Sequence, residues 1–193
     1  MITGATSVHW AQDEKLAGLQ AEILGLKARV ERLEGASPGE KVSLVVSSNE
    51  FDRLFPAFII ATGAASFAME VSMFFTLWGL HALKAKTVYK GKTAVEKMFS
   101  AMMPKRPENG PLTQMNYFGM GPRMMKGLMK KHNVETLPNL MALADELGVE
   151  ITACQMTMGL MGIREAELRP GVRYGGVAKF IADASESKFT LFL

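Results

Sequence analysis

Hydrophobic residues recur every three or four positions between Asp13 and Glu34, a pattern typical of a helix that pairs with another helix. Leu16, Ile23 and Val30 take heptad position a, and leucine takes every d position. β-Branched residues at a with leucine at d favour a parallel two-stranded coiled coil. The six positions are Leu16, Leu19, Ile23, Leu26, Val30 and Leu33. We therefore predict a coiled-coil helix over residues 13–34, after a disordered N-terminus at 1–12 and before a linker at 35–40.

The charged positions beside this stripe agree with a parallel pair. Glu22 of one chain faces Lys27 of its partner, and Arg29 faces Glu34, so both flanking contacts are attractive. An amphipathic helix that lies on its own domain would need the stripe but not this charge register. Both readings stay open, because about 20 residues are marginal for an autonomous helix.

The rest of the chain alternates between short β-branched or aromatic runs and helical patterns. Strands are expected at 42–46, 71–77, 149–154 and 189–193, with a further short element from Val172, and helices at 51–67, 137–147, 155–161 and 177–184. A methionine-rich helix is expected to open at 119–122 and run through Lys131. Strands separated by helices predict an α/β domain over residues 41–193, a three-layer fold whose mainly parallel sheet has helices on both faces.

Residues 84–118 have no such pattern and read as an inserted loop or lid. A basic patch opens the segment at Lys84, Lys86, Lys90 and Lys92, and three prolines follow. Eight methionines lie in or near it, at 98, 102, 103, 115, 120, 124, 125 and 129. Methionine fills irregular cores and also forms adaptable contact surfaces. We favour a surface or lid near the functional site, with a structural role as the alternative.

One stretch needs a check for a membrane span. Residues 54–83 are predominantly apolar and long enough to cross about 30 Å of hydrocarbon as a helix. Glu70 lies near the middle, where insertion of a charge costs about 2.5–3.5 kcal/mol. Small residues precede Glu70 and aromatic residues follow it. This change favours a helix followed by a strand and argues against membrane integration.

Composition narrows the possible functions. The 193 residues are 48% hydrophobic and 21% charged, which is ordinary for a globular protein. A formal charge of +3 is too small an excess to predict nucleic-acid binding. Cys154 is the single cysteine, so an internal disulfide and a multi-cysteine zinc site are excluded. Residues 1–12 lack a secretory pattern, and we expect a cytoplasmic protein in which this thiol stays reduced.

Cys154 is the candidate catalytic residue because it stands where a predicted strand gives way to a helix. Ligands gather at the carboxyl ends of parallel strands, and backbone N–H groups at a helix start favour a thiolate. Gln155 and the residues that end the first strand, Ser47, Ser48 and Asn49, are candidates to support it. His81 and His132 could assist if the fold brings them near. The alternative is an inert, buried cysteine.

The segment after the last internal strand makes the sequence resemble a known family. Residues 153–162, ACQMTMGLMG, resemble the cysteine segment of the DsrE/DsrF-like sulfur-relay family. Residues 74–80, FFTLWGL, resemble the second strand of its larger members. Gly119-Met120-Gly121, which leads into Met124-Met125, resembles their insertion, and the terminal LFL resembles their closing strand. The resemblance covers residues 41–193.

The resemblance implies a homo-oligomeric, sulfurtransferase-like carrier. Family members hold sulfur as a persulfide or thiosulfonate on this cysteine and pass it to partner proteins, such as small sulfur carriers or rhodanese-like proteins. Cys154 would have that role here, with no cofactor. Some relatives have a second cysteine that this chain lacks, so transfer must end on another protein's thiol, and a receiver or storage role stays open. Family assemblies are often trimeric or hexameric, whereas the heptads favour two strands.

Two other functions remain possible at this point. Cys154 together with nearby methionines such as Met156 and Met158 offers soft ligands suited to Cu(I), although only Met158 shares a helix face with the cysteine. A non-enzymatic oligomeric scaffold would use the coiled coil and leave Cys154 inert. In that case a Cys154→Ser substitution would change nothing.

Overall fold

The computed structural model describes residues 6–35, 40–102, 110–112, 114 and 120–193. The chain divides into two compact units, residues 1–38 and 39–193. The first unit holds helix α1, Thr6–Gly35. This helix begins seven residues before the predicted start at Asp13, so residues 6–12, expected to be disordered, are helical.

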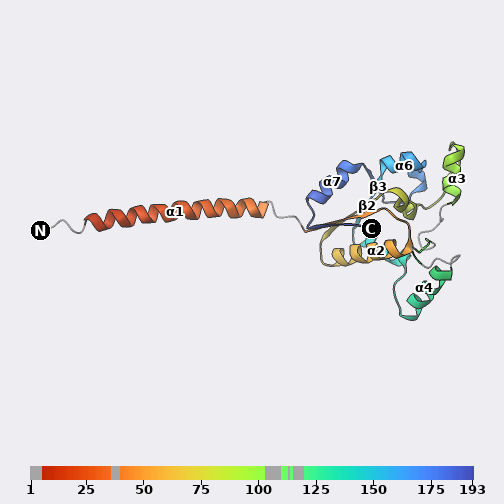
Figure 1. Ribbon diagram of the computed structural model, residues 1–193, viewed down its shortest axis with the longest axis horizontal. Helices are drawn as coiled ribbons and strands as arrows, with labels where there is room; N and C mark the ends of the chain where they lie inside the picture. Colours follow the sequence, from red (N-terminus) through yellow and green to blue (C-terminus); the bar gives the residue numbers. More distant parts are fainter. Residues whose placement is uncertain (1–5, 36–39, 103–109, 113, 115–119) are drawn as a thin grey trace. The chain divides into compact units, whose positions relative to one another are not determined.

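The second unit is built on a five-stranded parallel sheet in the order β4-β3-β2-β1-β5 (Figure 1). Three central strands, β1 (Lys41–Val46), β2 (Glu70–Phe75) and β3 (Glu150–Cys154), are almost continuously buried. The edge strands are β4 (Arg173–Gly175) and β5 (Phe189–Phe192). All four pairings are parallel, which confirms the predicted fold class.

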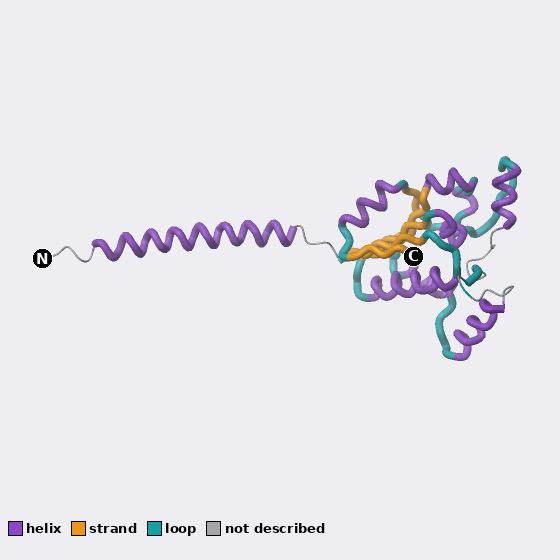
Figure 2. Tube along the Cα trace, in the orientation of Figure 1, coloured by secondary structure: helices purple, strands orange, loops and turns teal. Residues whose placement is uncertain are grey.

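Helices cover both faces of this sheet, as Figure 2 shows. Successive strand residues point to opposite faces. In β2 the ring of Phe75 lies 6.2 Å from that of Phe58 in α2 (Phe51–Ser66), whereas the ring of Phe74 lies 5.5 Å from that of Phe180 in α7 (Val177–Ser185). Helix α5 (Leu137–Glu146) packs beside α2, and α6 (Gln155–Met161) follows β3. The result is the expected three-layer arrangement.

The segment 84–118 contains a helix that the sequence analysis missed. Helix α3 spans Ala94–Met102 and begins with a reciprocal cap: the Glu96 N–H donates to the Thr93 hydroxyl at 3.3 Å, and the Glu96 carboxylate accepts from the Thr93 N–H at 2.6 Å. The methionine-rich helix α4 (Met120–Lys131) is present as predicted. Residues 103–109, 113 and 115–119 lie outside the described residues.

The predicted basic patch is wrong for two of its four lysines. The Lys92 ammonium is buried and lies 2.7 Å from a carboxylate oxygen of Glu167, a fully buried side chain in the short 3-10 helix η4 (Glu165–Glu167). Lys84, also buried, lies 3.8 Å from the same carboxylate. The Val88 and Arg164 N–H groups donate to Glu167 as well, at 2.7 and 3.0 Å. A buried charge needs such partners, and Glu167 thereby fixes the start of the inserted segment.

The apolar stretch 54–83 divides as predicted. Helix α2 ends at Ser66, β2 begins at Glu70, and a 3-10 helix, η1, covers Leu77–Leu83. Within the residues that the structure describes, no helix is long and apolar enough to cross a membrane.

We predict that Glu167→Gln lowers the free energy of unfolding by about 3–5 kcal/mol, because it leaves the buried Lys92 ammonium without its counter-charge. Urea denaturation of the two proteins would measure the difference. Glu165→Gln is the matched control: Glu165 is exposed on the same short helix, and its loss should change stability by less than about 0.5 kcal/mol. Equal effects of the two substitutions would contradict the prediction.

Candidate functional site

Cys154 is the last residue of β3 and the N-cap of α6. Its side chain is only 4% exposed, and it is a free cysteine. The backbone leaves the strand here with φ −70° and ψ 110°, and the first N–H groups of α6 follow within three residues. The predicted place of the cysteine, at the carboxyl edge of the parallel sheet, is confirmed.

The pairing of β2 with β3 brings the Thr76 hydroxyl close to the Cys154 thiol. Phe75 pairs with Ala153, so Thr76, the residue that follows β2, lies beside Cys154. The Thr76 hydroxyl lies 3.0 Å from that of Thr157, which is fully buried on the first turn of α6. The Leu77 N–H donates to the Thr157 hydroxyl at 3.4 Å. These contacts join the end of β2 to the start of α6 around the sulfur.

The groups around Cys154 set the pKa of its thiol. Burial raises the pKa of Cys154, but the Thr157 hydroxyl and N–H, the Thr76 hydroxyl and the Met156 N–H lie close to the sulfur and lower its pKa by more. The pKa therefore lies below the ordinary value for a thiol. All of these donors are neutral groups. Because the thiolate is the nucleophile in sulfur chemistry, the site favours the reactive form.

The turn after β2 is held in an uncommon conformation. Leu77 has a φ of +45°, a left-handed value that a branched side chain rarely adopts. Two hydrogen bonds tie the turn to the end of β1: the Thr76 N–H donates to the Val46 carbonyl and the Gly79 N–H to the Ser47 carbonyl, both at 3.0 Å. A Cβ at Gly79 would collide with the Val46 carbonyl oxygen. Glycine permits this close approach, which aims the Leu77 N–H at Thr157.

Large apolar side chains are exposed on α6 and η1, the two elements that the threonine pair joins beside Cys154. Met156 and Leu160 of α6 are 75% and 74% exposed, and Leu77 and Trp78 of η1 are more than 40% exposed. The two elements are in contact, and the Thr76–Thr157 hydrogen bond joins them. We call these four side chains the apolar rim. Exposed apolar clusters of this kind are typical of surfaces that bind other proteins.

The supporting residues expected from the sequence have other roles. The Ser47 hydroxyl donates to the Leu193 carbonyl at 3.0 Å, and the Ser48 hydroxyl donates to the Glu50 carboxylate at 2.9 Å. Asn49 is half-buried and Gln155 is exposed, and neither is among the groups that stabilise the thiolate. Thr76 and Thr157 supply the hydroxyl donors instead. The spacing along the chain gave no sign of them, because 81 residues separate the two threonines.

The histidines do not form a catalytic pair with Cys154 in the structure. His81 is buried, and its Nδ1 lies 3.2 Å from the Trp78 carbonyl oxygen. Burial lowers the pKa of this imidazole, and the nearby Lys84 adds to the effect, so His81 is neutral near pH 7. His132 follows α4 on the exposed surface.

Metal binding finds little support in the part of the chain that the structure describes. No group of three or more His, Cys, Asp or Glu side chains there could hold a metal ion. For a soft metal, Met158 is buried on the same helix as Met156, which is three-quarters exposed. The two thioethers therefore do not converge beside Cys154.

Comparisons with known proteins agree with the resemblance seen in the sequence. The model of the DsrE/DsrF/DrsH-like family matches residues 38–192, and α1 lies outside this match. The chain is 44% identical over 155 residues to the uncharacterized protein YrkE of Bacillus subtilis, a match that covers 80% of this chain and 97% of the relative. It is 32% identical over 165 residues to the sulfur carrier protein DsrE2 of Allochromatium vinosum, with 80% and 98% covered.

Among solved structures, the chain is similar to the ychN protein of E. coli. The two share 10% sequence identity with a TM-score of 0.45, and the match covers 79% of this chain and 99% of the other.

We predict that Thr157→Val raises the pKa of Cys154, because the substitution removes the hydroxyl donor while keeping the size of the side chain. Thiolate forms as pH rises through the pKa, so the alkylation rate of the variant should reach its plateau at higher pH than that of the wild type. A hydrogen bond to an ionised group contributes about 1.5–3 kcal/mol, so alkylation by iodoacetamide below the wild-type pKa should slow roughly tenfold.

Thr152→Val is the matched control for this measurement. Thr152 lies in the same strand as Cys154, and its buried hydroxyl has no hydrogen-bond partner. Removal of that hydroxyl should leave the pH profile of alkylation unchanged. If both variants shifted the profile equally, the role assigned to Thr157 would be wrong.

Proposed function

The chain belongs to the DsrE/DsrF/DrsH-like family, and from this premise we propose that it is a sulfur carrier that holds sulfane sulfur on Cys154 and passes it to a thiol of a partner protein. The observation that supports this most directly is the stabilised thiolate of Cys154 at the carboxyl edge of the sheet. The relative named as a sulfur carrier, 32% identical over nearly its whole length, points the same way.

The proposed transfer is a pair of displacements at sulfur. The Cys154 thiolate attacks the outer sulfur of a donor persulfide; the new S–S bond forms as the donor's S–S bond breaks, and the donor thiolate leaves. The acceptor thiolate then attacks the outer sulfur on Cys154, and the Cys154 thiolate leaves. A thiosulfonate group moves in the same way. Neither exchange has a net redox change, and the neutral donors around Cys154 stabilise the thiolate before and after each step.

The single cysteine limits how the sulfur can leave. Without a second thiol in the chain, no internal disulfide can form to release the sulfur, so an acceptor protein must come to Cys154. The apolar rim of Leu77, Trp78, Met156 and Leu160 is the surface that such a protein would meet first. We place this exchange in the cytoplasm, where thiols stay reduced.

We predict that polysulfide adds about 32 Da to the protein, the mass of one sulfur atom, and that tetrathionate adds about 112 Da as a thiosulfonate with release of thiosulfate. Intact-mass spectrometry would detect both adducts. Cys154→Ser should acquire neither, and a small-molecule thiol should return the loaded wild type to its original mass. An absence of adducts on the wild type would defeat the sulfur-carrier function.

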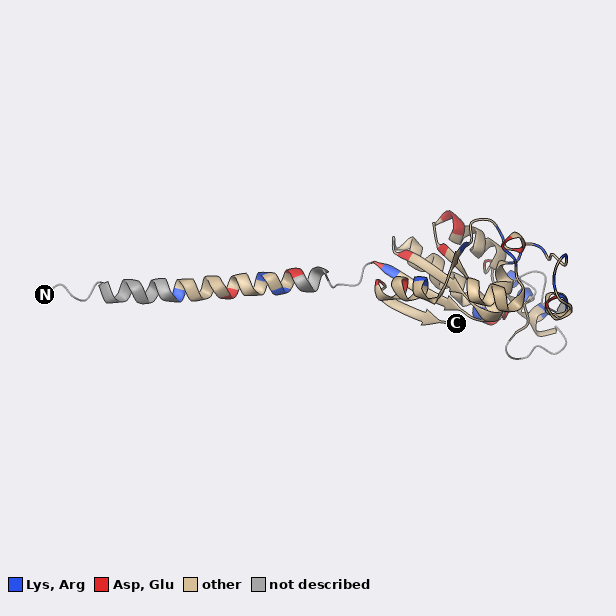
Figure 3. Ribbon diagram, turned by 90° about the horizontal axis from the view of Figure 1, so that it is seen from above, with Lys and Arg blue, Asp and Glu red and all other residues tan. Residues whose placement is uncertain are grey.

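We also propose that α1 pairs two copies of the chain as a parallel coiled coil. The helix extends over 30 residues in a unit of its own, and its described stripe side chains are about half exposed. Basic and acidic positions are interspersed along it, as Figure 3 shows, and the heptad register sets Glu22 of one chain opposite Lys27 of the other. The family match begins at residue 38, so this assembly would be additional to any that the domain forms.

We predict that Ile23→Glu, at a seam position, reduces the mass measured by analytical ultracentrifugation, because a charge would be buried between the helices. Leu24→Glu is the matched control: Leu24 is the adjacent residue, exposed and outside the seam, and its substitution introduces the same charge. The wild type and Leu24→Glu should have the same mass. An unchanged mass in Ile23→Glu would show that α1 does not assemble the chain.

A further inference from the structure

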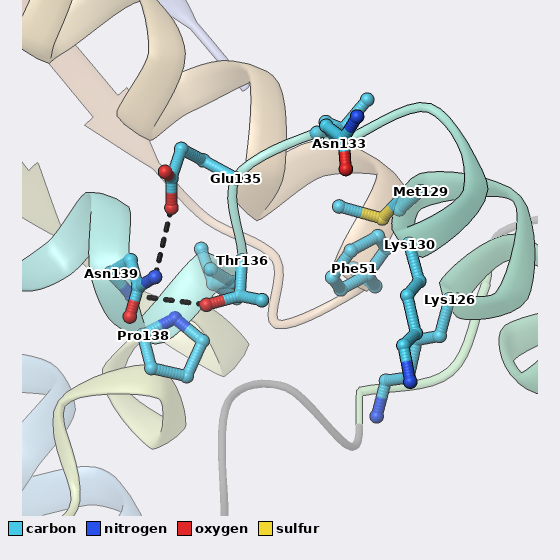
Figure 4. Close-up of a pocket in the computed structure, with 11 residues that line it drawn as sticks. Phe51, Lys126, Met129, Lys130, Asn133, Glu135, Thr136, Pro138 and Asn139 are labelled. Carbon is cyan, nitrogen blue, oxygen red and sulfur yellow. Dashed lines mark hydrogen bonds between the residues drawn. The ribbon is translucent and has the colours of Figure 1, made fainter.

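An open pocket of about 720 Å³ lies between α4 and the start of α5 (Figure 4). Its floor is apolar and includes Phe51, Met129 and Leu137. Phe51 and Leu137 are almost completely buried, so they form a fixed base, whereas most of the other lining side chains are exposed. The pocket thus combines a buried apolar floor with exposed side chains around its opening.

Among the described residues that line this pocket, basic side chains outnumber acidic ones. Lys126 and Lys130 line it from successive turns of α4, and in Figure 4 both side chains extend on the same side of that helix. Over its 12 residues α4 carries four basic side chains and no acidic one. Glu135 is the one carboxylate among the lining residues, and it accepts a hydrogen bond from the Asn139 amide at 2.8 Å. An acidic ligand would complement this charge.

The floor of the pocket supplies the apolar part of the contact. Phe51, Met129 and Leu137 line it, and methionine side chains adapt to varied apolar partners. Met120, Met124 and Leu128 recur every fourth residue and share the opposite face of α4, so they are not part of this surface. A small anion would use the lysines alone, whereas a protein segment with acidic and apolar residues would use the lysines and the apolar floor together.

The pocket also opens at the edge of the sheet that carries Cys154. Phe51 begins the helix that follows β1, and Leu137 begins the helix that leads into β3. In a parallel sheet, a helix between two strands starts at the edge where the first strand ends, which is the edge of Cys154. The pocket and Cys154 therefore lie at the same edge of the sheet.

From these observations we infer that the pocket between α4 and α5 is the docking site for an acidic, apolar segment of the protein that exchanges sulfur with Cys154. The inference rests on the proposed sulfur-carrier function for the identity of the partner. The contact itself depends on Lys130 and the apolar floor, and it requires no chemistry at the thiol.

The test compares two adjacent lysines of the full-length chain. Lys130→Glu reverses a charge that lines the pocket, whereas Lys131→Glu makes the same change one residue along, outside the lining. The probe is a short fluorescein-labelled amphipathic peptide with leucine on one face and glutamate beside it, and fluorescence anisotropy measures its binding. We expect roughly tenfold weaker binding to Lys130→Glu than to Lys131→Glu, since an attractive contact becomes repulsive. Binding of the wild type should weaken as salt is added.

Four outcomes would overturn the inference. The first is no binding of the peptide to the wild type. The second is equal weakening in both variants, which would indicate a general charge effect. The third is equally tight binding of a control peptide with lysine in place of glutamate. Phosphatidylglycerol vesicles that displace the peptide and bind both variants alike would likewise contradict it, in favour of a lipid surface.

Cys154→Ser separates this inference from the sulfur-carrier function. The variant should bind the peptide as the wild type does, because the pocket does not include the thiol. If the wild type takes up sulfur but binds no peptide, the docking site alone is wrong. If the peptide binds but no sulfur is taken up, the docking site stands and the chemistry assigned to Cys154 is wrong.

Discussion

The parallel pairing of β2 with β3 is the constraint on which the candidate site depends. With Phe75 opposite Ala153, the residues that leave the two strands, Thr76 and Cys154, come side by side at the sheet edge. A slip of one residue would turn every β2 side chain to the opposite face and move Thr76 away from Thr157. Because Phe74 and Phe75 pack on helices of opposite faces, such a slip would also take each ring away from the aromatic ring it now packs against. Core packing and thiol chemistry are therefore fixed by the same register.

The site stabilises an anion without placing a permanent cation beside it. The groups that lower the Cys154 pKa are hydroxyls and backbone N–H groups, whereas ion pairs are used elsewhere. The buried pair of Lys92 and Glu167 fixes the inserted segment, and Lys41 with Asp183 joins β1 to α7, 2.7 Å apart. Neutral donors stabilise a thiolate or a persulfide anion alike. A sulfur carrier has to accept and release sulfur, and donors that stabilise both anions suit both steps.

Local patterns in the sequence predicted most of the fold. Short β-branched and aromatic runs identified the central strands, and the helix expected at 137–147 is α5, which begins at Leu137 with the Asn139 N–H donating to the Thr136 hydroxyl. Helix α3 was missed although Thr93 and Glu96 have the spacing of a capping box. Thr76 and Thr157 were beyond prediction for another reason: only the sheet register brings together residues so far apart. The burial of Lys84 and Lys92 likewise depends on Glu167, more than 70 residues away.

Helix α1 adds a separate property to this chemistry. The family match excludes it, and the groups named above that lower the Cys154 pKa lie in the α/β domain. Two copies joined through α1 would instead present two sulfur-carrying edges to a partner. When a partner has two matching surfaces, the second contact becomes intramolecular, and overall affinity rises without any new contact type. Under the proposed sulfur-carrier function, each release of sulfur from Cys154 needs another protein, so pairing through α1 would favour release. The coiled coil would therefore act on partner capture, and the α/β domain on the transfer itself.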